Sequence, residues 1–155
     1  FWTDERRSQA GDMGMNPVKV TTLASIVDEE TIHDDEMPEI AGVYMNRIRR
    51  GMRLQADPTI KYAIGDFTVK RVLNKHLEVD SPYNTYRYAG LPPGPISIPS
   101  IAAIKAVLNY TDHQYLYFAA KPDFSGYHNF SKTHQQHIIN ARKYQRALNR
   151  NNILE

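Results

Sequence analysis

Three consecutive acidic residues follow an apolar run near the start of the chain, in the segment TLASIVDEETI (residues 22–32). If this segment is helical, successive side chains turn by about 100°, so Val27 and Glu30 lie on the same apolar stripe. Glu29 then points to the opposite side, and Asp28 lies at the edge of the stripe. The three carboxylates are therefore not equivalent, because only Glu30 shares the apolar face.

A carboxyl group on an apolar face is suited to general acid chemistry. Loss of water disfavours its charged form and raises its pKa, so Glu30 could donate a proton at neutral pH. The same pattern would also arise if the helix ended near Asp28, or if Glu30 paired with a buried arginine or lysine. We interpret the acids that follow, Asp34, Asp35 and Glu36, as first-turn charges of the next helix.

Three of the six histidines, His128, His134 and His137, lie close together in the sequence and could form a zinc site. On a helix, however, His134 and His137 share a face with apolar side chains. The pattern therefore favours histidines that pack in the core or support a site. We expect no bound metal and no cofactor.

Two predicted turns carry amide, hydroxyl and carboxyl side chains, namely Gln55 and Asp57 in the first turn and Asn84 and Thr85 in the second. Such groups, together with tyrosine rings, are suited to binding hydroxyl-rich, N-acetylated sugars. The pattern fits equally well with turns in which the polar side chains bond to their own backbone and the tyrosines pack at the rim. The neighbouring tyrosines are Tyr83, Tyr86 and Tyr88.

Composition excludes several classes of protein. The chain of 155 residues has no cysteine, which rules out disulfides, thiol catalysis and cysteine-ligated zinc. Its 19 Lys and Arg against 17 Asp and Glu leave a net charge of +2, too balanced to suggest a nucleic-acid groove. We interpret the basic residues 46–53 as a solvated helix end. No apolar run is long enough to span a bilayer.

The order of the elements predicts a mostly helical α+β domain. Helices are expected over 1–10, 17–32, 34–50, 57–64, 67–77, 99–110 and 131–149, with Asp57 and Ser131 as caps. QYLYFAA and GYHNF are expected to form a small antiparallel β-sheet. After the fifth of these helices comes a Pro/Gly/Tyr-rich stretch, DSPYNTYRYAGLPPGPISIPS, which must form a loop and could wall a cleft.

Four segments taken together carry a resemblance to a known family. LASIVDEET, YMNRIRRGMRLQADPTIKYAIG, SPYNTYRYAGLPPGPISIPS and GYHNFSKTHQQH resemble the successive motifs of the YceG-like endolytic murein transglycosylases, from about Leu23 to His137. That family usually has two glutamates separated by one residue in its first motif. Asp28 stands here in place of the first, and the second aligns with Glu30, the residue that the helical face also selects.

The resemblance implies a reaction. Such enzymes cut the β-1,4 bond between N-acetylmuramic acid and N-acetylglucosamine within glycan strands, leave 1,6-anhydro ends and so limit the length of nascent strands. One glutamate, here Glu30, serves as acid and then as base, without a metal or cofactor. The sugar would be positioned by Gln55, Asn84 and Tyr86, and the cleft would be shaped more loosely by Asn46, Arg47, Asp57 and His128.

The resemblance also implies a place in the cell. Family members are bacterial cell-envelope proteins with an inner-membrane anchor and a small LysM-like subdomain ahead of a catalytic domain on the periplasmic side. We expect residues 1–155 to be that catalytic domain without the anchor and subdomain, since the chain begins with Phe1. Expected partners are peptidoglycan strands and peptidoglycan synthases, not nucleic acid. A noncatalytic peptidoglycan-binding module and a histidine-ligated zinc hydrolase are the alternatives.

Overall fold

The computed structural model describes residues 1–66, 68–69 and 72–151. Within these ranges it is mostly helical, with one small two-stranded sheet, which confirms the α+β prediction. The elements in chain order are α1 (Asp4–Asp12), α2 (Pro17–Glu30), the 3-10 helix η1 (Asp34–Glu36), α3 (Met37–Arg49), α4 (Asp57–Ile64), the 3-10 helix η2 (Asn74–Glu78), α5 (Ile101–Leu108), β1 (Tyr117–Ala120), β2 (His128–Ser131) and α6 (His134–Arg150).

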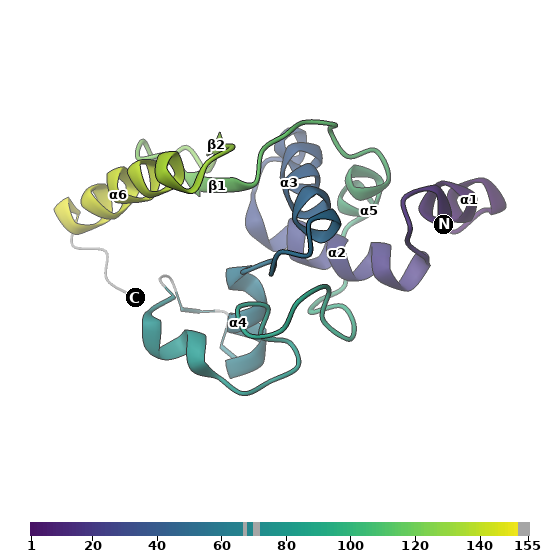
Figure 1. Ribbon diagram of the computed structural model, residues 1–155, viewed down its shortest axis with the longest axis horizontal. Helices are drawn as coiled ribbons and strands as arrows, with labels where there is room; N and C mark the ends of the chain where they lie inside the picture. The colour runs from purple at the N-terminus through teal and green to yellow at the C-terminus, as the bar shows by residue number, and fades with distance from the viewer. Residues whose placement is uncertain (67, 70–71, 152–155) are drawn as a thin grey trace.

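Helices α2, α3 and α5 form the centre of the molecule and pack against one another (Figure 1). Helix α1, drawn in purple, packs against α2 and α5. Helix α2 begins as predicted, because the Asn16 side chain accepts a hydrogen bond of 2.9 Å from Lys19 N and Pro17 occupies the first helical turn. The buried core includes Val20, Leu23, Ile26, Ile40, Tyr44, Leu54 and Val107.

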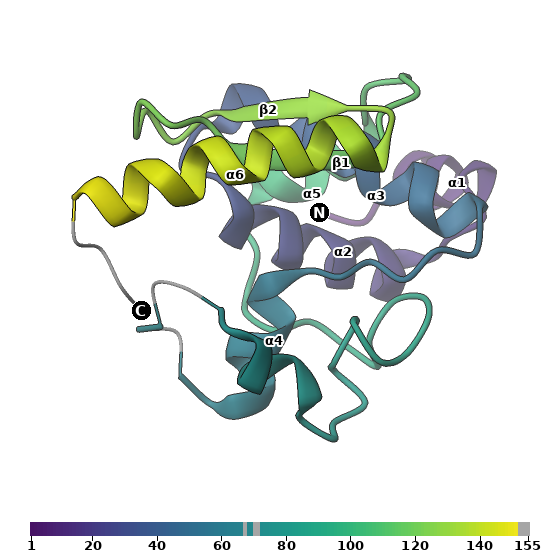
Figure 2. The same ribbon diagram turned by 60° about the vertical axis from the view of Figure 1, so that its left-hand side comes forward.

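The two strands form an antiparallel hairpin in which Tyr117 pairs with Ser131 and Ala120 pairs with His128. Helix α6 packs along both strands, and β1 also contacts α3 (Figure 2). The hairpin predicted from QYLYFAA and GYHNF is therefore confirmed, with the first strand limited to its last four residues. The hairpin and α6 form one side of the molecule, on top of the helical core in this view.

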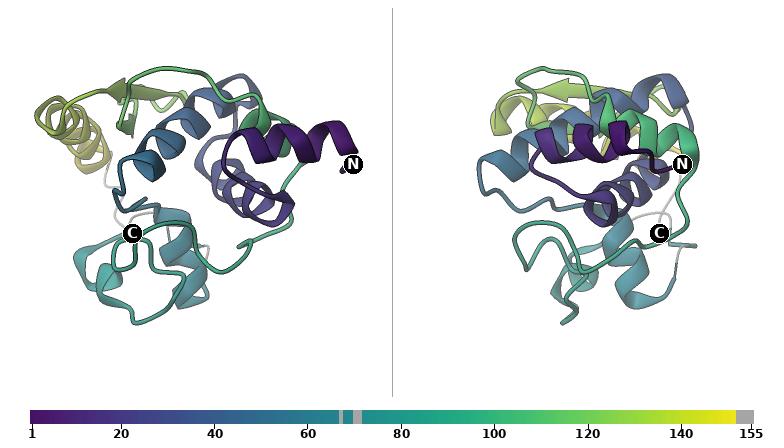
Figure 3. Two further views of the ribbon diagram at one scale, coloured as in Figure 1. Left: turned by 45° about the vertical axis from the view of Figure 1, so that its right-hand side comes forward. Right: turned by 90° about the vertical axis from the view of Figure 1, so that its right-hand side faces the viewer.

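Helix α4 and the segment after it form the opposite side. Helix α4 ends at Gly65, whose φ of 76° places it in the left-handed region that glycine adopts most readily. No helix or strand occurs from residue 79 to residue 100, all of which the structure describes. Figure 3 shows this stretch leaving the side of α4 and returning to the start of α5. The prolines predict this irregular course, because they cannot donate backbone hydrogen bonds.

Two predicted helix caps are wrong. Ser131 lies in β2, and Thr133 caps α6 instead by accepting a hydrogen bond from Gln136 N. Asp57 is the first residue of α4 rather than its cap, which leaves its carboxyl free for other contacts.

The helix predicted over 67–77 is replaced, in the residues described, by the short 3-10 helix η2. The rest of the prediction, at Phe67, Lys70 and Arg71, lies outside the described residues. The segment contains β-branched Thr68, Val69 and Val72, which have modest helix propensity, and tertiary contacts decide such cases.

None of the helices in the described ranges has the length and apolar character needed to cross a membrane.

Candidate active site

Glu30 is the last residue of α2, and the chain turns into an extended conformation directly after it. Its side chain is half-buried and lines a cavity of about 440 Å³, whereas Glu29 is exposed. The cavity is bounded by α2, α3, the segment that enters α4, the loop around Tyr86, the hairpin and α6. The predicted positions of Glu30 and Glu29 are therefore confirmed, and the helix does not end at Asp28.

The Glu30 carboxyl is held by a tyrosine of the neighbouring core helix. Tyr44, which is 2 % exposed, donates its hydroxyl to Glu30 Oε2 at 2.5 Å. Glu30 forms no ion pair with any residue in the described ranges, so a buried arginine or lysine partner does not account for its position. Oε1 has no hydrogen-bond partner within those ranges and remains for a ligand.

Burial raises the pKa of Glu30 from 4.5 to about 8. The largest cause is loss of water, and the negative charge of Asp57 adds to it. The Tyr44 hydrogen bond and the positive charge of Lys61 act in the opposite direction without cancelling the effect. Glu30 is therefore mostly protonated at pH 7, as a general acid must be.

Tyr44 is a site residue that the sequence analysis did not select, because it lies within the predicted helix over 34–50 and its partner is not evident from the sequence. The feature that could have pointed to Tyr44 is its hydroxyl, since a buried tyrosine hydroxyl needs a hydrogen-bond partner. Which partner it finds depends on the packing of α2 against α3, and that packing is a tertiary property.

Asp57 and Tyr86 form a second polar pair in the same cavity. Tyr86 donates its hydroxyl to Asp57 Oδ1 at 2.5 Å. Burial raises the pKa of Asp57, and the hydrogen bond from Tyr86 partly opposes this shift. The pKa of Tyr86 is raised first by burial and then by the charge of Asp57, so its hydroxyl keeps its proton and stays a donor.

Gln55 also lines the cavity and has an unusual backbone conformation. Its φ of 50° lies in the left-handed region, which residues other than glycine seldom adopt. The loop around residue 85 holds this conformation: Thr85 O accepts from Gln55 N at 3.2 Å, and Thr85 Oγ1 accepts from Ala56 N at 2.9 Å. Backbone strain of this kind commonly occurs at functional sites.

The structure does not bring Asn84 into the cavity lining. Its side chain is fully buried and donates to Leu77 O and Val79 O, while its Oδ1 accepts from Tyr86 N at 2.9 Å. This is the turn-forming alternative that the sequence left open. Asn84 thus positions the loop that carries Tyr86 rather than facing a ligand.

Asn46 is likewise used within the protein. Its amide donates to His113 O at 2.8 Å and Tyr115 O at 2.9 Å, which fixes the segment leading into β1. Arg47, which was also predicted to shape the cleft, is buried and donates to Leu116 O at 2.7 Å. It lines the cavity as well.

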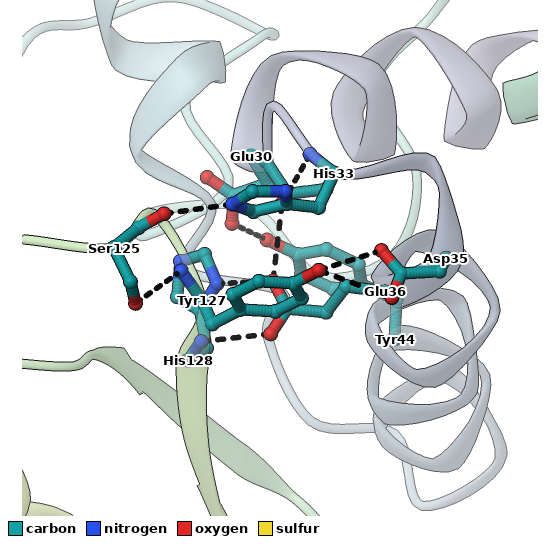
Figure 4. Close-up of polar contacts among 9 residues, drawn as sticks. Glu30, His33, Asp35, Glu36, Tyr44, Ser125, Tyr127 and His128 are labelled. Atoms are coloured by element: carbon teal, nitrogen blue, oxygen red, sulfur yellow. Dashed lines mark hydrogen bonds and ion pairs between the residues drawn. The ribbon is translucent and has the colours of Figure 1, made fainter.

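Figure 4 shows how the residues after Glu30 are clasped by the hairpin. Glu36 is only 5 % exposed; its Oε2 accepts from His128 N at 2.7 Å, and its Oε1 lies 2.6 Å from His128 Nδ1. Oε1 also accepts from Thr31 Oγ1 at 3.0 Å. Glu36 lies in the first turn of η1 as predicted, and the structure adds a tertiary role, because Glu36 links Thr31, the residue next to Glu30, to β2.

A second clasp lies beside the first (Figure 4). The His33 ring stacks on Tyr127 with centroids 3.7 Å apart, and His33 Nε2 lies 2.7 Å from Ser125 O. The Tyr127 hydroxyl donates to Asp35 at 3.1 Å. Gly126 has a φ of 87°, in the left-handed region, and a Cβ there would lie 3.0 Å from Ile32 and 3.1 Å from His33, so this position favours glycine. The two clasps join the end of α2 to the hairpin.

Asp28 serves a different purpose from Glu30. Its Oδ2 accepts from Ser100 N at 2.9 Å, and its Oδ1 accepts from Ser100 Oγ at 3.3 Å. Since Ser100 is the capping residue of α5, this contact ties α2 to the start of α5.

The three histidines considered as zinc ligands all line the cavity but have separate contacts. His128 is engaged by Glu36, and His137 stacks on Tyr117 with centroids 5.0 Å apart. The rings of His134 and His137 lie 6.4 Å apart. Within the described ranges, no three histidine, aspartate or glutamate side chains gather closely enough to hold a metal ion.

The fold and the cavity define an α+β domain that presents one protonated carboxyl at the end of a core helix, the arrangement of a general acid site. The model of the YceG-like family matches residues 1–143, and the chain belongs to this family.

Curated relatives agree with this assignment. The chain is 43% identical over 126 residues to a Bacillus subtilis protein named endolytic murein transglycosylase, a match that covers 81% of this chain and 34% of that protein. It is 39% identical over 106 residues to the protein of the same name from Streptococcus pneumoniae serotype 2, covering 66% of this chain and 19% of that protein. The chain thus spans about a third or less of these relatives.

A solved structure shows the same fold. The crystal structure of a YceG-like protein from Listeria monocytogenes superposes with a TM-score of 0.80 at 40% sequence identity. The match covers 87% of this chain and 43% of the Listeria chain.

Proposed function

We propose that this domain is a lytic transglycosylase that cleaves the β-1,4 bond between N-acetylmuramic acid and N-acetylglucosamine within peptidoglycan strands. The observation that carries the proposal is the Glu30 carboxyl, which lines a cavity and has its pKa raised to about 8. The relatives that share this segment are named endolytic murein transglycosylases. The geometry and the names point to the same chemistry.

In the first step Glu30 acts as the general acid. Its proton passes to the glycosidic oxygen, the bond from that oxygen to C1 of the muramyl sugar breaks, and positive charge develops at C1. Tyr44 holds Oε2 of the carboxyl, so Oε1 is the oxygen that faces the leaving group. Glu30 becomes a carboxylate beside the charged sugar, and the attraction between them stabilises the transition state.

In the second step the same carboxylate acts as the base. It removes the proton from the 6-hydroxyl of the muramyl sugar, and O6 bonds to C1 to close the 1,6-anhydro ring. The proton lost in the first step is thereby restored to Glu30, and no water is consumed. Because the attacking oxygen belongs to the reacting sugar, the protein needs mainly to hold the ring in a reactive shape.

Gln55 and the Asp57–Tyr86 pair are the polar groups best placed for holding the sugar, since all three line the cavity with Glu30. A second carboxyl group in the cavity, that of Asp57, makes glycoside hydrolysis a second candidate function, because an ordinary glycoside hydrolase uses two carboxyl groups. The Asp57 carboxyl is engaged by the Tyr86 hydroxyl, which makes Asp57 less available as a nucleophile or base. The two reactions differ in product, because hydrolysis adds one water.

The test is to incubate purified glycan strands with the protein and identify the new ends by mass spectrometry. We expect 1,6-anhydromuramyl ends from the wild type and a loss of about 10²- to 10⁴-fold or more in rate from Glu30→Gln, because one residue supplies both proton transfers. Glu29→Gln is the matched control, since it changes the adjacent but exposed acid. Products one water heavier would indicate the hydrolase, and equal effects of the two substitutions would exclude Glu30 as the acid.

The same assay separates the remaining alternatives. A noncatalytic peptidoglycan-binding module would release no product, and its binding would survive Glu30→Gln. A zinc hydrolase would lose activity on treatment with a chelator. We expect chelators to leave the rate unchanged, because the proposed reaction uses only protein groups.

Peptidoglycan as the substrate places this domain in the bacterial cell envelope. Cutting within strands would limit the length of nascent glycan. The proposal also includes an inner-membrane anchor, a periplasmic position and cooperation with peptidoglycan synthases. It includes no nucleic-acid partner.

A further inference from the structure

Arg47 is a buried cation without a counter-charge among the residues that the structure describes. It is 6 % exposed; its Nε donates to Leu116 O, and its Nη1 donates to Arg53 O at 2.9 Å and lies 3.5 Å from Leu54 O. Its guanidinium lies 4.9 Å from the centre of the Tyr117 ring. These partners are carbonyl oxygens and an aromatic face, none of which carries a full negative charge.

The second terminal nitrogen, Arg47 Nη2, has no hydrogen-bond partner in the described ranges. No aspartate or glutamate within those ranges forms an ion pair with Arg47. A buried charge that is not paired costs free energy, and arginine cannot escape the cost by losing its proton. A site that retains such a charge is suited to an anionic ligand.

Arg47 lies between two hollows. The first is the cavity that holds Glu30, and the second has a volume of about 430 Å³. Both hollows are lined by Arg47, Gln55, Tyr117 and His134. Tyr44, which holds Glu30, precedes Arg47 by three residues on α3, so the two side chains project from the same side of that helix.

Charge is divided between the hollows. The acids Glu30 and Asp57 line only the first. The second is lined by Arg47, Arg53 and His134, with no acidic residue of the described ranges in its wall. An anion would therefore meet attraction in the second hollow and repulsion from Asp57 in the first.

We propose that the second hollow is a carboxylate subsite in which Arg47 binds a carboxylate carried by the muramyl residue of the substrate. This inference rests on the proposed function, because the muramyl sugar has a lactyl ether that ends in a carboxyl group whereas N-acetylglucosamine is uncharged. The planar guanidinium matches a carboxylate, and its Nη2 is open for the bond. Arg53, exposed at the rim, adds positive charge.

The subsite would determine which bond is cut. With its carboxylate fixed at Arg47, a muramyl sugar would place its own C1 and glycosidic oxygen in the cavity beside Glu30. The neutral neighbour, N-acetylglucosamine, would gain nothing at Arg47. Two carboxylates have this chemistry: the lactyl carboxylate itself in peptide-free strands, and a carboxylate of the attached peptide in peptide-bearing strands.

The test compares binding of native strands with strands whose carboxyl groups have been converted to neutral methylamides. Binding is measured by calorimetry in the Glu30→Gln background, so that no strand is cut. We expect methylamide formation to weaken binding by about 10- to 100-fold, the worth of a hydrogen bond to a charged partner. The comparison of native with methylamide strands is made once with peptide-free strands and once with peptide-bearing strands. The series in which methylamide formation weakens binding identifies the source of the carboxylate.

Arg47→Gln should abolish this preference for native strands. Because Arg47 also supports the loop at residue 54, the measured quantity is the ratio of the two affinities within one variant, which damage to the fold would not change. Arg53→Gln, at an exposed position, should also lower the ratio; because Arg53 Nε donates to Arg87 O, the ratio is again the measured quantity. Arg50→Gln is the matched control, because it removes a charge from the end of the same helix outside both hollows.

Three results would overturn the subsite. The first is equal binding of native and methylamide strands in both series, and the second is a ratio of the two affinities that neither Arg47→Gln nor Arg53→Gln changes. The third is a fall of this ratio in Arg50→Gln as large as in Arg47→Gln. Failure of the proposed function would look different. In that case no strand of either kind would bind, or native strands would bind but the wild type would release no anhydromuramyl product.

Discussion

The hydroxyl oxygen of Tyr44 lies 2.5 Å from Oε2 of Glu30 and joins the central helix α3 to the last residue of α2. Tyr44 is itself buried in the core, so the position of the Glu30 carboxyl is set by a rigid part of the molecule. The hydrogen bond also favours the charged form of Glu30 and so limits the rise of its pKa.

The first prediction concerns the pH dependence of the reaction. Since Glu30 must be protonated to act as acid, kcat/KM should fall about tenfold per pH unit above its pKa of about 8. Tyr44→Phe removes the hydrogen bond that lowers this pKa, so the fall should begin at a higher pH. The rate should also drop by about 10- to 100-fold, because Oε2 is no longer held. A profile that keeps its alkaline limb in Tyr44→Phe would show that the limb belongs to another group.

The second prediction concerns stability. Glu30 has a pKa of about 8 in the folded protein against 4.5 as its ordinary value. Between these values the folded state holds a proton that the unfolded state has lost, so the free energy of unfolding should fall as pH rises and level off above pH 8. Glu30→Gln lacks this proton, and its stability relative to wild type should rise across the window by at most about 1.4 kcal/mol per pH unit.

Urea denaturation of both proteins at several pH values between 5 and 8.5 measures this difference. Glu29→Gln should stay within about 0.5 kcal/mol of wild type at pH 7, because the residue is exposed. A constant difference between Glu30→Gln and wild type across the window would contradict the raised pKa.

The third prediction concerns the Glu36 clasp. Glu36→Gln replaces one carboxylate oxygen with an NH₂ group, which cannot accept from His128 N or Nδ1. We expect a loss of about 1–3 kcal/mol in the free energy of unfolding, the cost of leaving a buried donor unpaired. The His128 amide should also exchange its hydrogen faster. Asp34→Asn, at an exposed position two residues away, serves as the control, and a similar loss there would argue against a special role for Glu36.

The fourth prediction separates Asp28 from Glu30. Asp28→Ala removes both bonds to Ser100 and should lower the free energy of unfolding by about 1 kcal/mol, because the start of α5 loses its anchor. The rate per folded molecule should stay within about twofold of wild type, since Asp28 does not line the cavity. A tenfold fall in kcat without loss of stability would instead assign Asp28 a chemical role.

Local chemistry determines much of this fold. The start of α2 follows from Asn16 and Pro17, and the end of α4 follows from Gly65, because caps and left-handed glycines act within one turn of the chain. Helical periodicity also separates Glu30 from Glu29, since both positions belong to one regular helix. These features need no knowledge of distant residues.

Other features depend on which surfaces meet. Glu36 resembles any first-turn acid in the sequence, and it is buried only because β2 brings His128 against it from 92 residues away. Asn84 resembles a sugar-binding amide, and its role in the loop follows from the carbonyl groups that the turn presents to it. In the described part of 67–77, the 3-10 helix η2 replaces the expected α-helix, because weak propensities give way to tertiary contacts.

By itself, the sequence determined most of the helical positions, the hairpin and the choice of Glu30 among three acids, because periodicity and caps are local properties. Only the tertiary structure decided that Tyr44 holds Glu30, that Asp57 shares its cavity and that Arg47 has no counter-charge in the described part of the chain. The physical reason is that pKa values and ion pairing depend on burial and on neighbours distant in sequence, which exist only once the helices, the loop and the hairpin have packed together.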